Sequence, residues 1–133
     1  MTPLTPNRLG PVTITLPAEP TLSRIVRLAA SGMASMAQFS VDEIEDIRIA
    51  VSEVLIALIE HGESGDVELR LSVDNGKFRI DGSTAVSELN LDHPDLALCR
   101  TVLDGVGATH GIELSPEGRA SIWAMVSSST TGE

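Results

Sequence analysis

The spacing of apolar positions changes several times along the chain, and each change predicts an element. Residues 12–16 form a short apolar-rich run that ends at Pro17, which is typical of a strand. Pro20 then opens a segment in which apolar residues recur at steps of three and four. These residues are Leu22, Ile25, Val26, Ala29, Met33 and Met36. We expect a first helix that buries them as one stripe.

The next helix has the clearest start signal in the sequence. Ser40 and Glu43 have the spacing of a capping box, and Gly62 is a natural stop. Ile49 and Ile56 project from a different side than the main apolar stripe. That stripe comprises Ile44, Ile47, Val51, Val54 and Leu58. A helix that is apolar on two sides is covered on two sides, so we expect this one between a sheet and the first helix.

After Gly62 the apolar period becomes two, which is the strand period. Apolar and polar residues alternate over 67–73, and Phe78 and Ile80 continue the alternation beyond Asn75-Gly76, a strong hairpin signal. The pattern further on predicts a short helix over 96–103, ended by Gly105, and a last hairpin of 112–114 with 120–126.

This order of elements predicts the fold class. It is β-α-α-β-β-α-β-β, which indicates an α/β (α+β) two-layer sandwich: a mainly antiparallel sheet with the helices on one face. Residues 1–11 hold three prolines and a glycine, and we expect a flexible arm there. Residues 12–126 form the single expected domain, and the small, polar residues 127–133 form a flexible tail.

Charge and composition narrow the function classes. The chain carries 19 acidic against 9 basic residues, a net charge of −10, and only 2% aromatic residues. Such a field repels phosphate backbones and offers few rings for base stacking, so we expect no direct nucleic-acid binding. The start lacks the features of a signal peptide, and the longest apolar run, 54–59, is too short for a bilayer. We expect a cytoplasmic protein without a membrane anchor.

The stretch 47–62, IRIAVSEVLIALIEHG, places Glu53 and Ala57 one helical turn apart on one face. It resembles the N-box helix of the histidine-kinase-like ATPase (Bergerat) fold, and in particular the anti-sigma-factor serine kinases, whose pattern is A-V-S-E-x-x-x-N-x-x-x-H. The resemblance extends over residues 12–126 and implies that Glu53 is a general base. Where the family has the asparagine that binds the magnesium ion of ATP, this chain has Ala57, whose methyl group offers no oxygen to a hard cation.

Two further motifs of the family are altered. In its D-x-G-x-G motif the aspartate holds the adenine amino group, and the sequence DGST at 81–84 supplies Asp81 and Gly82 as the candidate cofactor-binding residues, with a different glycine spacing. Where the glycine-rich lid would stand, the chain has His93-Pro94-Asp95. A proline removes one N–H donor and a carboxylate repels phosphate. We therefore predict that ATP and Mg²⁺ binding is weak or absent, with no metal ligand at position 57.

Other chemistry-bearing residues receive structural interpretations or partner roles. Arg24 and Arg27 lie off the apolar stripe of the first helix, which in the family contributes to the partner surface, so the resemblance makes them candidate contacts. The histidines His61, His93 and His110 predict no metal site, because none pairs with another ligand at helical spacing. His61 suits the C-terminal end of a helix dipole. Cys99, the only cysteine, excludes an internal disulfide, and we expect a small core thiol.

The resemblance implies a function with alternatives. The first is a regulatory protein of a partner-switching pathway that binds a sigma factor or an anti-anti-sigma antagonist, with ATP binding weak or lost. The alternative is an active anti-sigma-factor serine/threonine-protein kinase that phosphorylates the antagonist, with Glu53 as base and Asp81 on the adenine. A third is that the fold serves an unrelated interaction. The family often pairs, so a homodimer is also expected.

Overall fold

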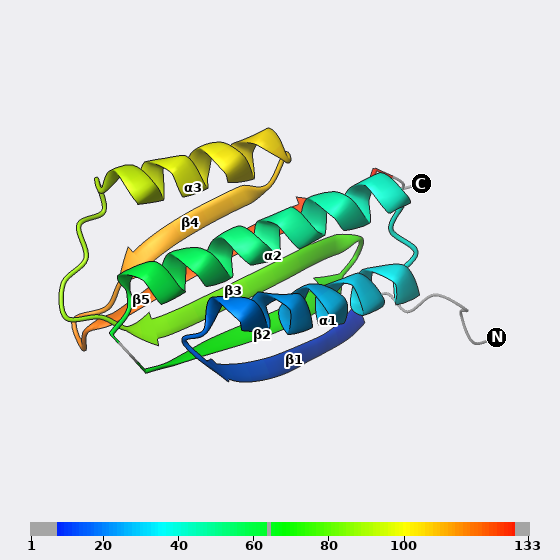
Figure 1. The fold of residues 1–133 in the computed structure, drawn as a ribbon. Coiled ribbons are helices and arrows are strands. Elements are labelled where there is room, and N and C mark those ends of the chain that lie inside the picture. The colour runs from blue at the N-terminus through cyan, green and yellow to red at the C-terminus, as the bar shows by residue number, and fades with distance from the viewer. Residues whose placement is uncertain (1–7, 64, 130–133) are drawn as a thin grey trace.

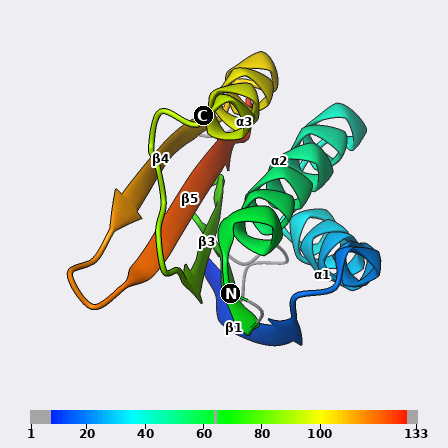
Figure 2. The same ribbon diagram turned by 60° about the vertical axis from the view of Figure 1, so that its left-hand side comes forward.

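The computed structural model describes residues 8–63 and 65–129, which form three α-helices and five strands. In chain order the elements are β1 (Arg8–Pro17), the 3-10 turn η1 (Pro20–Leu22), α1 (Ser23–Met36), α2 (Val41–His61), β2 (Asp66–Asp74), β3 (Lys77–Ala85), α3 (Pro94–Gly105), β4 (Thr109–Leu114) and β5 (Arg119–Ser127). Within this part of the chain every strand pair is antiparallel, and the strand order is β1-β2-β3-β5-β4. The helices lie together on one face of the sheet, which confirms the predicted fold class (Figures 1 and 2).

The hairpin between β2 and β3 forms as its turn residues predict. Asn75 and Gly76 have φ of 50° and 72°, and both values are positive as a type I′ turn requires. Asp74 pairs with Lys77 across the turn. The alternating apolar residues of β2 all face the helices and are buried: Val67, Leu69, Leu71 and Val73.

α2 is the central helix of the layer. The Glu43 amide donates to Ser40 Oγ at 3.1 Å, and Ser40 N–H donates to Glu43 Oε1 at 2.7 Å, so the predicted capping box is confirmed. At the other end Gly62 is the C-cap residue, and its N–H donates to the carbonyl of Leu58 at 2.9 Å. The helix packs on β3 and β5, with α1 on one flank and α3 on the other (Figure 2). It is therefore covered on three sides.

The first strand begins earlier than the sequence predicted. β1 starts at Arg8, paired with Asp74, so residues 8–11 belong to the sheet and not to a flexible arm. The register shifts between Leu9 and Val12, around Gly10-Pro11. β1 is an edge strand, where a proline without N–H is tolerated and a bulge can be absorbed. The rest of the expected arm, 1–7, and residues 130–133 of the tail lie outside the described residues.

The expected apolar stripe of α1 divides between two faces. Val26 and Met33 are buried, whereas Ile25 and Met36 are 50% and 62% exposed. Leu28, which the predicted stripe did not include, is 68% exposed. The alanines of α1 explain the difference, because Ala30 and Ala34 complete the side that meets α2. Among the described residues, no helix combines the length and apolar character needed to cross a membrane.

Candidate functional site

The side of α2 that faces α3 carries the residues singled out by the family pattern. Glu53, Ala57 and His61 follow one another at four-residue steps. Cys99 of α3 lies alongside, with Sγ 3.9 Å from the carbonyl oxygen of Glu53. Cys99 is 3% exposed, which confirms the expected core thiol. The structure therefore brings Glu53, Ala57 and the start of α3 together.

Glu53 is a half-buried acid without a cation beside it. Among the residues that the structure describes, no ion pair involves it. Burial, aided by the charge of Glu60, raises the pKa of Glu53 above its ordinary value of 4.5. Burial and then the charge of Glu53 raise the pKa of Cys99 to about 11, so this thiol stays protonated at neutral pH. A carboxylate with a raised pKa could accept a proton, provided that a substrate reaches it.

The space beside Ala57 is filled by side chains. Ala57 is 6% exposed and borders a cavity of about 10 Å³ between α2, α3 and the sheet. The lining residues are Ala57, Leu58, His61, Gly62, Thr84, Val86, Leu89, Leu96, Ala120 and Ile122. The Thr84 hydroxyl donates to the carbonyl of Asp66 at 3.1 Å. Such a cavity holds one water molecule at most, whereas pockets for small molecules reach about 300–1,000 Å³.

Asp81 lies on the opposite face of the sheet from Glu53. Along β3, Phe78 and Ile80 are buried under the helices, so the strand alternation turns Asp81 to the open face. There Arg79 donates to both carboxylate oxygens, Nε to Oδ2 and Nη2 to Oδ1, each at 2.9 Å. The guanidinium also lies 4.7 Å from the Trp123 ring centroid. With the sheet between them, Asp81 and Glu53 cannot contact the same small ligand.

Gly82 faces the helices and serves packing. A Cβ at this position would lie 2.5 Å from Leu58 Cδ1 and 3.0 Å from Val54 Cγ1. The first distance is shorter than real Cβ contacts and the second is tighter than most, so the missing side chain lets α2 pack close to β3. The structure therefore separates the two candidate cofactor-binding residues, Asp81 and Gly82, onto different faces.

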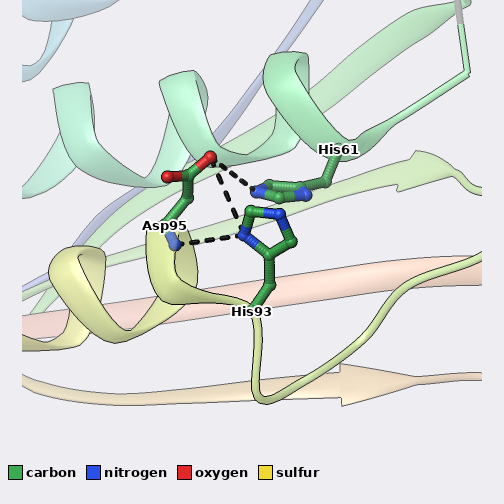
Figure 3. Close-up of side chains that lie close together, drawn as sticks. All are labelled: His61, His93 and Asp95. Atoms are coloured by element: carbon green, nitrogen blue, oxygen red, sulfur yellow. Dashed lines mark hydrogen bonds and ion pairs between the residues drawn. The ribbon is translucent and has the colours of Figure 1, made fainter.

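The altered lid motif forms the start of α3 and gathers a cluster that the sequence did not predict. His93 is the N-cap residue, and its Nδ1 accepts the Asp95 N–H at 3.1 Å. His61, the last residue of α2, faces these two residues (Figure 3). One potential ligand atom from each of His61, His93 and Asp95 lies within 4.8 Å of the other two. The search at helical spacing did not predict that His61 and His93 meet, because they come from two different elements. His110 instead pairs with Asp104, Nε2 to Oδ1 at 2.7 Å.

The two candidate partner contacts on α1 differ in environment. Arg24 is exposed and forms no hydrogen bond or ion pair with residues 8–63 or 65–129. Arg27 is half-buried, and its Nη1 donates to Ser23 Oγ at 3.0 Å and Ser52 Oγ at 3.4 Å. Arg27 therefore links α1 to α2, while Arg24 is available to another molecule.

Comparison with known proteins agrees with this architecture. The sequence profile of the histidine kinase-like ATPase domain matches residues 16–107. The serine-protein kinase RsbW of Listeria monocytogenes is 40% identical over 63 residues, which cover 47% of this chain and 40% of that protein. The chain spans less than half the length of the curated relatives it matches.

Solved structures show the same fold at low sequence identity. The RsbU and RsbW domains of a Mycobacterium tuberculosis protein superpose with a TM-score of 0.63 at 20% identity, covering 90% of this chain and 33% of that one. The SiaB–SiaC complex from Pseudomonas aeruginosa gives a TM-score of 0.58 at 12% identity, covering 86% and 88%.

Proposed function

The chain belongs to the histidine kinase-like ATPase domain family, and we propose that it is a regulatory binding protein of a partner-switching pathway. Its partner would be a sigma factor or an anti-anti-sigma antagonist, and its ATP binding would be weak or lost. The similarity to the serine-protein kinase RsbW and to a structure of the SiaB–SiaC complex supports this class of partner. The geometry around Ala57 supports the loss of nucleotide binding.

The closed space at Ala57 carries the proposal. A magnesium ion needs oxygen ligands, and the methyl group at this position supplies none. A cavity of about 10 Å³ leaves no room for an adenine between α2 and β3. Asp81, the remaining candidate for the adenine contact, is on the other face of the sheet and is already bound by Arg79. The residues present therefore do not fit ATP and Mg²⁺.

One observation favours the alternative of an active serine/threonine-protein kinase. Glu53 keeps the position of the family's general base, and its raised pKa suits a group that accepts a proton. This alternative requires α3 to move away from α2, so that a nucleotide can enter the space that Leu96 and Leu89 now fill.

We further propose that the outward side of α1 is the partner surface. It carries Arg24 next to the exposed apolar side chains of Ile25, Leu28 and Met36. Exposed apolar groups beside an unpaired arginine are typical of interface centres, and the guanidinium fork suits the carboxylates of an acidic partner. Arg27 is the second candidate contact, but it already holds α1 against α2.

Titration calorimetry with ATP and Mg²⁺ at moderate salt tests the loss of nucleotide binding. Each missing polar contact typically costs about 1–3 kcal/mol, roughly ten- to hundredfold in affinity. We expect no binding in the low micromolar range, together with a complex between the protein and its co-encoded partner that forms without nucleotide. Low-micromolar ATP binding with phosphate transfer to the partner would establish the kinase instead.

Arg24→Glu tests the partner surface. We expect partner affinity to fall at least about tenfold with an unchanged melting temperature, because a like charge now meets the acidic partner. Arg70→Glu, the same charge reversal at an exposed position of β2, is the matched control. An equal loss in both variants would mean that overall charge matters and that the interface lies elsewhere.

A further inference from the structure

The ends of α2 and α3 bring three metal-binding side chains together. His61 Nε2 lies 3.9 Å from Asp95 Oδ2, and His93 Nδ1 lies 3.7 Å from the same oxygen (Figure 3). The imidazole rings meet edge to face, with centroids 4.8 Å apart. We propose that His61, His93 and Asp95 bind a divalent transition-metal ion of the zinc type.

The separation of the ligand atoms is close to what such an ion requires. With metal bonds of about 2.0–2.1 Å, neighbouring ligands of a tetrahedral ion lie roughly 3.3 Å apart. The three ligand atoms are now within 4.8 Å of one another. The side chains of His93 and Asp95 are 43% and 55% exposed, so they have room to turn toward a common centre. The backbone that carries them belongs to two helices that pack together and hold the site in place.

His61 supplies an independent reason to expect a ligand here. Its side chain is only 15% exposed, and its Nε2 is buried without a hydrogen-bond partner among the described residues. A buried polar atom without a partner is unfavourable and uncommon in folded proteins. The same nitrogen points at the Asp95 carboxylate but stays beyond hydrogen-bond distance (Figure 3). An ion between them would satisfy it.

The donor set selects the class of ion. Two imidazoles and one carboxylate suit Zn²⁺ and its neighbours in the first transition row, whereas Mg²⁺ and Ca²⁺ prefer oxygen ligands alone. Three protein ligands leave a fourth position for water. One hydrogen bond changes, because the His93 Nδ1 lone pair that now accepts the Asp95 N–H would bind the ion. The metal would then join the C-terminal end of α2 to the N-terminal end of α3.

Titration of tag-free protein with Zn²⁺, and with Co²⁺ as a visible probe of tetrahedral coordination, tests the site. We expect one ion per chain, a tetrahedral cobalt spectrum and a melting temperature that rises with Zn²⁺. His93→Ala and Asp95→Asn should each weaken binding at least about tenfold. His110→Gln, which removes a histidine that pairs with Asp104, should leave binding unchanged.

Two outcomes would overturn the proposal. One is wild-type binding that His93→Ala and Asp95→Asn both leave intact. The other is an equal loss in His110→Gln, which would show that histidines bind the ion without a built site. Asp95→Asn keeps the shape of the side chain and the N–H that His93 accepts, so it separates a lost ligand from a damaged helix start.

Discussion

α1 and α3 flank the same helix, α2, but their side chains differ in direction. α1 exposes large apolar side chains to solvent, whereas α3 turns several side chains toward α2. α1 exposes Ile25, Leu28 and Met36 on the side away from α2. On α3, Leu96 and Cys99 are buried against α2, and Asp95 approaches His61 at the end of α2. Leu98 is the large apolar side chain that α3 leaves 62% exposed.

The difference supports two separate proposals for one scaffold. An outward apolar face that none of the described residues covers suits another macromolecule. An inward cluster of polar groups at a helix junction suits an ion or a small ligand. In a working nucleotide site α3 and the loop before it would have to move, whereas α1 could act without moving. Substitutions on α2 and α3 test how tightly α3 packs against α2, and substitutions on α1 test which of its arginines stabilise the fold.

The largest effect is expected from Leu96→Ala. Leu96 is 1% exposed and fills the space beside Ala57, so truncation should cost about 2–5 kcal/mol in the free energy of unfolding, measured by denaturant titration. Leu98→Ala is the matched control on the exposed side of α3 and should stay within about 0.5 kcal/mol. If α3 were a loosely held lid, Leu96→Ala would cost under about 1 kcal/mol.

Ala57→Asn tests the same closure from α2. The amide would enter a cavity without room for it, and burying it should cost about 1–3 kcal/mol, lowering the melting temperature by several degrees without any gain in ATP affinity. Ala97→Asn places the same side chain at an exposed position of α3 and should cost only about 0.5 kcal/mol of helix propensity. Tighter binding of ATP with Mg²⁺ at an unchanged melting temperature would indicate an open, vestigial site.

Local sequence signals were sufficient to predict the fold class and the order of the helices and strands. The capping box at Ser40 and Glu43 and the turn at Asn75-Gly76 involve residues within three positions of one another, and both form as predicted. The order of elements followed from the apolar period together with the proline, glycine and capping signals that bound each element. The start of β1 was missed because Gly10-Pro11 reads as a break, and only its place at the sheet edge makes a proline acceptable there.

The candidate site was predicted less well than the fold, and Asp81 and His61 show two different reasons. The orientation of Asp81 was available in the sequence, since Phe78 and Ile80 point to the core and their neighbours must point away. The family motif outweighed that signal. The cluster of His61 with His93 and Asp95 was not available, because it depends on how α3 docks against α2. A search at helical spacing examines one element at a time and cannot find ligands from two. The expectation of a homodimer stays a prediction.

On the α1 side, Arg27→Gln should have a moderate effect. Arg27 donates to Ser23 and Ser52 from a half-buried position, so its loss should cost about 0.5–1.5 kcal/mol in unfolding experiments. Arg24→Gln, the same change at the exposed arginine one turn earlier, should stay within about 0.5 kcal/mol. Equal costs would mean that Arg24 also holds α1 in place, which would weaken its role as a free partner contact.

The smallest effect concerns Glu53, and its sign distinguishes a functional acid from a structural one. Because the folded state raises the pKa of Glu53 above 4.5, the folded protein binds this proton more tightly than the unfolded chain. Stability therefore falls as the pH rises from the ordinary glutamate range through the folded pKa, and this loss is the penalty for the charged carboxylate. Glu53→Gln should remove it, stabilising the protein at pH 7 by less than about 1 kcal/mol, since solvent screens a half-exposed carboxylate. The gain should vanish below about pH 4, where the unfolded chain is protonated as well. Glu88→Gln, which removes one negative charge from the exposed loop before α3, is the matched control. A loss of stability in Glu53→Gln at neutral pH would mean that the carboxylate is held by favourable contacts, and so belongs to the packing of α2 against α3.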